Sequence, residues 1–143
     1  MSFAPRSMLF VSAEKPERYS KAINSGADMV CIDLEDAVHP DNKQAARDAV
    51  VQFLNAPDRA ATEVIVCVRI NAISTLDGLR DLVLIADSGC QLDAVMLPKV
   101  NSASEIRLAQ SWLAQTCSRL VALIESPAGI EQAYSIADGA ASN

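Results

Sequence analysis

Short apolar runs alternate with amphipathic segments along the whole 143-residue chain. The apolar runs are rich in β-branched residues and are bounded by polar residues, which predicts buried strands. The segments between them have helical spacing, with Pro16 near one start and Gly26 near its end. The predicted strands span residues 7–12, 27–35, 63–71, 93–100 and 119–126. The predicted helices span residues 15–26, 42–55, 75–88 and 102–115, and a last one begins at residue 127.

Two of these helices have a predicted apolar face. In the helix over 42–55 the face consists of Ala46, Ala49, Val50, Phe53 and Leu54. In the helix between Ser74 and Gly89 it consists of Leu79, Leu82, Val83 and Ala86. This spacing at i, i+3 and i+4 is typical of a helix that covers a core. Ser102 and Glu105 stand at capping-box spacing and mark the start of another helix.

Strands that alternate with helices indicate an α/β fold with a parallel sheet, because each connection must cross back over the sheet. Five strand–helix units are present, without a linker, a repeat or a low-complexity segment. Five units could complete an open doubly wound sheet. They are too few for a whole (β/α)8 barrel, which needs about 250 residues. The pattern alone leaves both architectures open.

Charged and polar residues gather where the predicted strands end. In parallel β/α folds these ends share one face, on which active sites form. Carboxylate oxygens suit a hard ion such as Mg²⁺, and an arginine beside them could bind a carboxylate or stabilise an oxyanion. The pattern predicts metal-assisted chemistry on a small acid that contains a carbonyl. The residues are Asp33, Glu35 and Asp36, then Arg69 and Asn71, then Lys99, and then Glu125.

These residues also have structural interpretations. Asp33 or Asp36 could cap the turn that follows its strand. Arg69 could form a structural ion pair with Glu125. Lys99 could be a solvated strand end or the partner of a carboxylate.

Composition narrows the class of protein. Half of the residues are apolar and the formal net charge is −6, which fits one packed domain without a basic surface for nucleic acid. No apolar stretch is long enough for a signal peptide or a membrane span.

His39 precedes Pro40 in a polar segment and is expected to be an ordinary loop histidine. The cysteines form no C-x-x-C pair, so we expect buried reduced thiols and a cytoplasmic protein. They are Cys31, Cys67, Cys90 and Cys117.

Five motifs resemble those of the HpcH/HpaI aldolase/citrate lyase family, which includes the citrate lyase β-subunit. "RSMLFVSAEKPERYSKA" is similar to its N-terminal pattern, and "GADMVCIDLEDAV" matches its second strand and the turn after it. "VRIN", "VMLPKV" and "LIESPAGIEQA" resemble the next three strand motifs, in the same order. The resemblance covers nearly the whole chain and favours the barrel over the open sheet.

The resemblance implies a TIM (β/α)8 barrel of which this chain holds the first five units. Residues 1–143 would be the N-terminal part of a single catalytic domain, ending before strand six. The implied activity is that of a Mg²⁺-dependent carbon–carbon lyase or aldolase that acts through an enolate. The implied substrates are hydroxyacyl-CoA thioesters, such as citryl-CoA or malyl-CoA, or related hydroxy acids. A homo-oligomer is expected, and neither nucleic acid nor a membrane is an expected partner.

The resemblance also assigns roles to single residues at the strand ends. Glu125 of "LIES" would be one Mg²⁺ ligand, and the second, an aspartate, is expected beyond Asn143. Arg69 of "VRIN" would be catalytic, contacting the substrate and stabilising the enolate. Glu35 and Asp36 would accept hydrogen bonds from waters on the metal.

For the CoA thioester, the resemblance places Arg6 and Lys21 near the phosphates. Ser12 and Ala13 stand where the family usually has proline and glycine, so a free acid is an alternative substrate. Two other functions remain open. One is a thioester hydrolase acting on a malyl-CoA-type substrate. The other is a non-catalytic binding or assembly piece that lacks half of the metal site.

Overall fold

Five parallel strands form one sheet, in which spatial order follows chain order. The computed structural model describes residues 4–57, 59 and 62–141. Each strand pairs with its sequence neighbour, so that β1 and β5 are the two edges of the sheet. The strands are β1 (Met8–Ser12), β2 (Met29–Asp33), β3 (Ile65–Arg69), β4 (Ala94–Leu97) and β5 (Leu120–Ala122).

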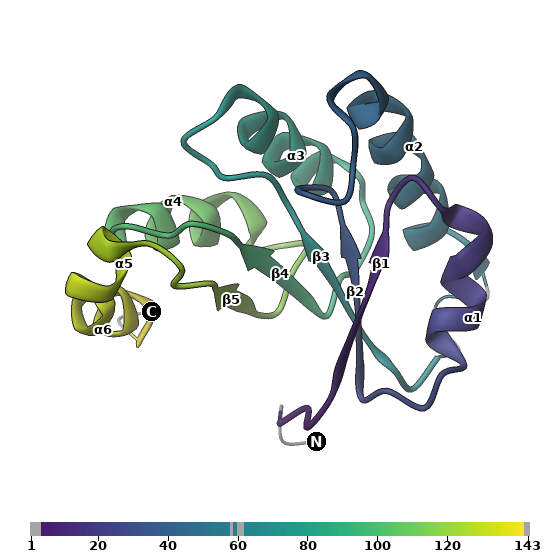
Figure 1. The fold of residues 1–143 in the computed structure, drawn as a ribbon, viewed down its shortest axis with the longest axis horizontal. Helices are drawn as coiled ribbons and strands as arrows, with labels where there is room; N and C mark the ends of the chain where they lie inside the picture. Colours follow the sequence, from purple (N-terminus) through teal and green to yellow (C-terminus); the bar gives the residue numbers. More distant parts are fainter. Residues whose placement is uncertain (1–3, 58, 60–61, 142–143) are drawn as a thin grey trace.

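The helices α1 to α4 lie on one side of this sheet (Figure 1). A parallel crossover is right-handed, so adding every strand in the same direction places every helix on the same face. A doubly wound sheet reverses direction and covers both faces, so that alternative is excluded for the described units. The helices are α1 (Tyr19–Ile23), α2 (Lys43–Leu54), α3 (Leu76–Asp87), α4 (Ala103–Leu113), α5 (Pro127–Glu131) and α6 (Ala133–Ala141). Two 3₁₀ turns, η1 (Pro16–Arg18) and η2 (Pro40–Asn42), precede α1 and α2.

The two faces of the sheet belong to different apolar clusters. On the helix side, Val30 and Ile32 of β2 pack in the main core with helix residues such as Val50 and Ile85. On the opposite side, Met29 and Cys31 lie in a smaller cluster whose buried members all come from the strands. Successive side chains of a strand point to opposite faces. Because both faces of β2 are buried, its first four residues are all apolar, rather than every second one, and only Asp33 at its end is charged.

The predicted order of strands and helices is confirmed, and the element ends differ by a few residues. The segment over 15–26 is a 3₁₀ turn followed by the short helix α1, so it is less regular than expected. The predicted face of α2 is confirmed in part: Ala46, Val50 and Leu54 are buried, whereas Ala49 is partly exposed and the unpredicted Arg47 is buried. Phe53 packs edge-on against Tyr19, with 5.1 Å between the ring centroids.

The predicted face of α3 was partly wrong. Leu79 and Val83 are 44% and 41% exposed, whereas Gly78, Asp81 and Leu82 are buried. Asp81 turns inward because its carboxylate binds polar groups of two other elements. An apolar-periodicity argument cannot recognise a charged residue on the buried face of a helix.

The capping prediction at α4 was also wrong in its details. Ser102 is the N-cap, but its hydroxyl bonds to the Ser104 hydroxyl at 2.8 Å and not to a backbone N–H. The Glu105 carboxylate accepts the N–H of Asn101 at 3.0 Å instead of the N–H of Ser102.

The cysteines match their prediction in part. Cys31, Cys67 and Cys90 are buried free thiols, and Cys117 is a free thiol that is partly exposed. Within the described part of the chain, no helix has the length and apolar character needed to cross a membrane.

Gly78 allows α3 to approach the segment that follows β3. A Cβ placed on Gly78 would lie 2.0 Å from the backbone oxygen of Ala72, a distance that no side chain can occupy. We expect Gly78→Ala to lower the free energy of unfolding by about 3 kcal/mol, because backbone must move to admit the methyl group. Urea unfolding measures the change. Arg80→Ala, at an exposed site on the same helix, is the control and should change it by less than about 0.5 kcal/mol. Equal effects of the two substitutions would contradict the close approach.

Candidate functional site

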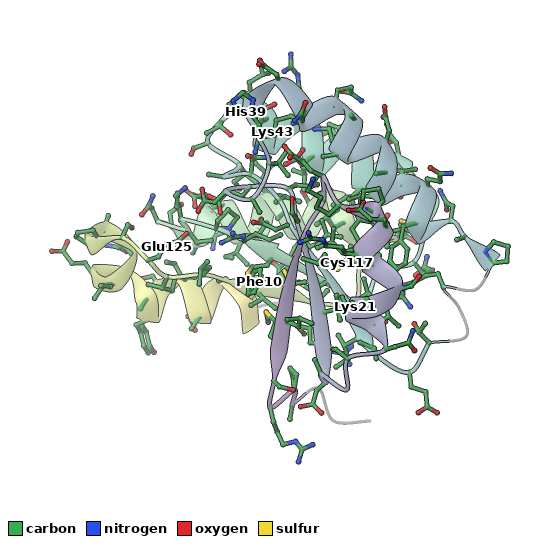
Figure 2. The ribbon with its side chains drawn as sticks, turned by 45° about the vertical axis from the view of Figure 1, so that its right-hand side comes forward. Phe10, Lys21, His39, Lys43, Cys117 and Glu125 are labelled. Atoms are coloured by element: carbon green, nitrogen blue, oxygen red, sulfur yellow. The ribbon has the colours of Figure 1, made fainter. Side chains whose placement is uncertain are left out.

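The carboxyl ends of the strands surround a cavity of about 670 Å³. Its lining comes from the segments that follow four consecutive strands, β2 to β5. Lys43 and Glu125, both labelled in Figure 2, lie on this cavity although they are far apart in the sequence. The charged residues of the lining are Glu35, Asp36, Lys43, Lys99 and Glu125.

A buried ion pair joins Asp33 and Arg69, which do not line this cavity but lie next to Glu35, one of its lining residues. The two residues are direct partners in the register of β2 and β3. Arg69 donates from Nε to Asp33 Oδ1 at 2.8 Å and from Nη2 to Oδ2 at 2.7 Å. Asp33 also accepts the N–H groups of Glu35 and Ala37, at 2.9 and 3.0 Å. These last two bonds fix the turn that leaves β2, so of the two residues that could cap this turn, Asp33 is the one that does.

Both members of the pair are held in their charged forms. Burial alone would raise the pKa of Asp33, but the hydrogen bonds from Arg69 and from the N–H groups of Glu35 and Ala37 outweigh it. The pKa of Asp33 is therefore below its ordinary value. The hydrogen bond to Asp33 raises the pKa of Arg69, against the opposing effect of burial. Each charge compensates the other in a site where neither could be left alone.

Arg69 has two further contacts. Its guanidinium lies over the ring of Phe10, with Cζ 5.1 Å from the ring centroid, which is cation–π geometry. Its Nη1, the terminal nitrogen not bonded to Asp33, is 3.4 Å from Glu35 Oε2. The alternative of a structural ion pair between Arg69 and Glu125 is excluded, because Arg69 pairs with Asp33 and Glu35 instead.

Glu35 is the buried carboxylate of the cavity, with a side chain that is 6% exposed. Lys99 Nζ donates to its Oε1 at 2.6 Å, which confirms that Lys99 is the partner of a carboxylate. That hydrogen bond raises the pKa of Lys99. Glu35 Oε2 is buried and accepts no hydrogen bond from the described residues. Asp36, 70% exposed, is 3.8 Å from the same ammonium group.

Glu125 follows β5 and is exposed to the cavity. Its Oε1 accepts the backbone N–H of Lys99 at 3.0 Å. The next residue, Ser126, caps α5 by accepting the N–H of Gly129 at 3.0 Å. Within the described residues, no cation lies within ion-pair distance of Glu125.

Lys43 fixes the segment that carries Glu35 and Asp36. Its ammonium group, at the start of α2, donates to the backbone oxygens of Leu34 and Glu35, both at 2.6 Å, and to Asn71 Oδ1 at 2.8 Å. Sequence analysis missed Lys43, because a lysine at the start of an amphipathic helix normally lies in solvent.

Asn71 links this segment to α3. It donates from Nδ2 to the oxygen of Leu34 at 3.0 Å and to Asp81 Oδ2 at 2.6 Å. Asp81 is paired in turn with Arg47 of α2 at 2.6 Å. These bonds tie the turn after β2 to both neighbouring helices, so the position of Glu35 is set by three elements.

The donor set suits one half of a magnesium site. Mg²⁺ usually takes one or two protein carboxylates, and waters and substrate oxygens complete its shell. Glu125 offers an exposed carboxylate of this kind. Oε2 of buried Glu35 accepts no hydrogen bond from the described residues, so it can accept one from a nearby water. The described residues contain no group of three or more histidine, cysteine, aspartate or glutamate side chains that could hold a metal.

Comparison with known proteins identifies the family of this chain. The sequence model of the HpcH/HpaI aldolase/citrate lyase family matches residues 6–143. The chain belongs to this family. It is 34% identical over 141 residues to an L-malyl-CoA/β-methylmalyl-CoA lyase of Cereibacter sphaeroides, covering 92% of this chain and 44% of that protein. It is 43% identical over 98 residues to a citrate lyase subunit beta-like protein of Mycobacterium tuberculosis, covering 68% and 33% of the two chains.

Solved structures of the family have the same fold over this region. The citrate lyase beta subunit of M. tuberculosis, complexed with oxaloacetate and magnesium, superposes with a TM-score of 0.75 at 38% identity. The match covers 96% of this chain and 55% of that one. A complex of CitE from the same organism with magnesium, acetoacetate and coenzyme A gives 0.72 at 36% identity, over 96% and 46% of the chains. The chain therefore spans about half the length of the relatives with solved structures.

The two residues that the family resemblance assigns to CoA lie apart from the cavity. Arg6 precedes β1, at the amino ends of the strands, where it bonds to Asp28. Lys21 is on α1 beside a second cavity of about 580 Å³, which Phe10 also lines, and Figure 2 shows it well away from Glu125. Their roles remain predictions. His39 is an exposed N-cap of η2 whose Nδ1 accepts the N–H of Asp41, as expected for a loop histidine.

The lowered pKa of Asp33 predicts a loss of stability in acid. An unfolded aspartate has a pKa of about 3.9, so the unfolded chain takes up this proton first as the pH falls. The stabilisation is complete above that pH and is lost as the pH falls towards the lower pKa of the folded state. We expect Asp33→Asn to cost about 2 kcal/mol of unfolding free energy at pH 7. The difference from the wild type should shrink below about pH 4.

Urea unfolding between pH 3 and 7 measures this difference. Asp48→Asn, at an exposed site on α2, is the matched control and should lie within about 0.5 kcal/mol of the wild type. A difference between Asp33→Asn and the wild type that stays constant over this range would rule out a buried, charged Asp33.

Proposed function

We propose that this chain is part of a Mg²⁺-dependent carbon–carbon lyase or aldolase that cleaves or forms a hydroxyacyl-CoA or a related hydroxy acid. The observation that carries the proposal is the convergence of Glu125, Arg69 and Glu35 at one end of the sheet. Membership of a family with malyl-CoA lyase relatives supports the same chemistry. A relative solved with magnesium, acetoacetate and coenzyme A supports a small acid and a CoA thioester as ligands.

In this proposal Glu125 binds the metal through its exposed carboxylate. The ion, when bound, supplies Lewis acidity that polarises the carbonyl of the bond that forms or breaks. Glu35 and Asp36 accept hydrogen bonds from waters beside it. The hydrogen bond from the Lys99 N–H fixes one oxygen of Glu125 and leaves the other for the cation.

Arg69 is the proposed catalytic residue. Two of its nitrogens are bound to Asp33, and the ring of Phe10 supports the plane of the guanidinium. The group is therefore fixed before a substrate arrives. Its remaining nitrogen, Nη1, donates to the oxygen on which negative charge develops as the carbon–carbon bond breaks. A fixed donor stabilises such an oxyanion without reorganising during the reaction.

We also propose that residues 1–143 are the N-terminal part of a (β/α)8 barrel domain. The helices cover one face of the sheet, as in a barrel, and both edges of the sheet are unpaired within the described residues. Leu9 and Phe10 on edge strand β1 are half exposed, as expected if further strands continue the sheet.

We propose a homo-oligomer as well, and a cytoplasmic location in keeping with four free thiols.

Glu125→Ala tests the metal role in the full-length protein. We expect the rate of Mg²⁺-dependent cleavage of malyl-CoA or citryl-CoA to fall by about a thousandfold, because the carboxylate that holds the ion is lost. The rate at which acetyl-CoA forms is the measurement. Glu131→Ala, at an exposed glutamate on α5, is the matched control and should retain wild-type activity.

The products also distinguish the alternatives. Release of free CoA without acetyl-CoA would identify a thioester hydrolase. If the wild type bound Mg²⁺ but cleaved no member of a panel of hydroxyacyl-CoA thioesters and hydroxy acids, the lyase proposal would fail.

A further inference from the structure

Lys99 contacts two carboxylates that come from distant parts of the chain. Its backbone N–H donates to Glu125, which follows β5, at 3.0 Å. Its ammonium group donates to Glu35, which follows β2, at 2.6 Å. Strands β3 and β4 lie between those two strands in the sheet. Lys99 therefore connects two groups that their own strands do not bring together.

The backbone contact depends on an uncommon conformation. Lys99 has a φ of +53°, in the left-handed region that residues other than glycine, asparagine and aspartate rarely adopt. It stands after Pro98, where β4 has ended and the chain turns towards α4. Such strain is often found at functional sites, where the surrounding structure holds it in place. Here the turn directs the Lys99 N–H at the carboxylate of Glu125.

The side-chain contact has a different consequence. Glu35 is buried, and its second oxygen accepts no hydrogen bond from the described residues and lies 3.4 Å from Nη1 of Arg69. The ammonium of Lys99 therefore holds Glu35 in one orientation and neutralises its charge. A positive charge near a cation site also opposes cation binding, so the two contacts of Lys99 affect a metal in opposite ways.

We propose that Lys99 is a positioning residue with two separable actions. Its left-handed backbone orients Glu125 for the metal, and its ammonium group orients Glu35 for the reaction. The inference rests on the proposed function, because it treats Glu125 as the metal ligand. It goes further by assigning a role to a residue that the proposed function does not use.

Three substitutions separate the two actions. Lys99→Asn removes the ammonium but keeps a residue that tolerates the left-handed region, so the contact with Glu125 is retained. Lys99→Val removes the ammonium and also places a β-branched residue where the backbone cannot stay left-handed. Lys99→Arg keeps both the charge and the conformation. Lys15→Asn, at an exposed lysine in the turn before η1, is the control.

Mn²⁺ affinity and turnover of the full-length protein are the first readouts. We expect Lys99→Val to weaken Mn²⁺ binding by about tenfold, measured by electron paramagnetic resonance, and Lys99→Asn to leave it unchanged or tighter. We expect Lys99→Asn to lower kcat by about tenfold with a smaller change in KM, because Glu35 is misplaced after the substrate has bound. Lys99→Arg should recover most of the kcat that Lys99→Asn loses. Equal weakening of Mn²⁺ binding in Lys99→Asn and Lys99→Val would overturn the separation.

Crystal structures of the variants without metal give a readout that does not depend on activity. Glu35 should leave its position in Lys99→Asn, and Glu125 should leave its position in Lys99→Val alone. If both carboxylates stay in place in both variants, the inference is wrong. If the wild type binds no Mn²⁺ and cleaves no substrate, the proposed function fails, and the crystal structures still decide whether Lys99 positions the carboxylates. Circular dichroism verifies that each variant is folded.

Discussion

The ion pair between Asp33 and Arg69 is the contact on which the rest of the site depends. It joins the last residues of two central strands, so a shift of one residue in their register would leave a buried charge without its partner. The same carboxylate accepts two N–H groups of the following turn, and the same guanidinium lies over Phe10 of the edge strand. One pair thus sets the register of two strands, the path of a loop and the orientation of an arginine.

Three carboxylates in four residues acquire different properties from their partners. Asp33 is buried against Arg69 and has a structural role, Glu35 is held by Lys99, and Asp36 stays in solvent. Their spacing alone does not determine this division. It follows from the turn after β2, which Lys43 fixes by donating to two of its backbone oxygens. Because the ammonium group of Lys43 binds backbone and amide oxygens, it fixes the loop without pairing with any of the three carboxylates.

Sequence reasoning identified the order of the elements and the set of polar residues at the strand ends, because both follow from short-range patterns. Among the alternatives that it left open were a turn capped by Asp33 and a carboxylate partner for Lys99. It could not show that Glu35 is this partner, because 64 residues separate the two and only the assembled sheet brings them together. It placed Leu79 on the buried face of α3 because nothing local marks Asp81 as buried. Nor does any local sequence signal indicate the left-handed backbone of Lys99, since lysine has no preference for that conformation.

The distribution of cations supports the proposed role of Glu125 as a metal ligand. Arg69 donates hydrogen bonds to Asp33, and the ammonium group of Lys99 donates to Glu35. The ammonium group of Lys43 donates to carbonyl and amide oxygens. Within the described residues, the contact that remains for Glu125 is a neutral N–H, which orients the carboxylate and leaves its charge in place. A carboxylate that is oriented but not neutralised attracts a cation more strongly than one already paired with lysine or arginine. The partners of the other charged residues at the strand ends therefore leave Glu125 as the carboxylate that we propose to bind the ion.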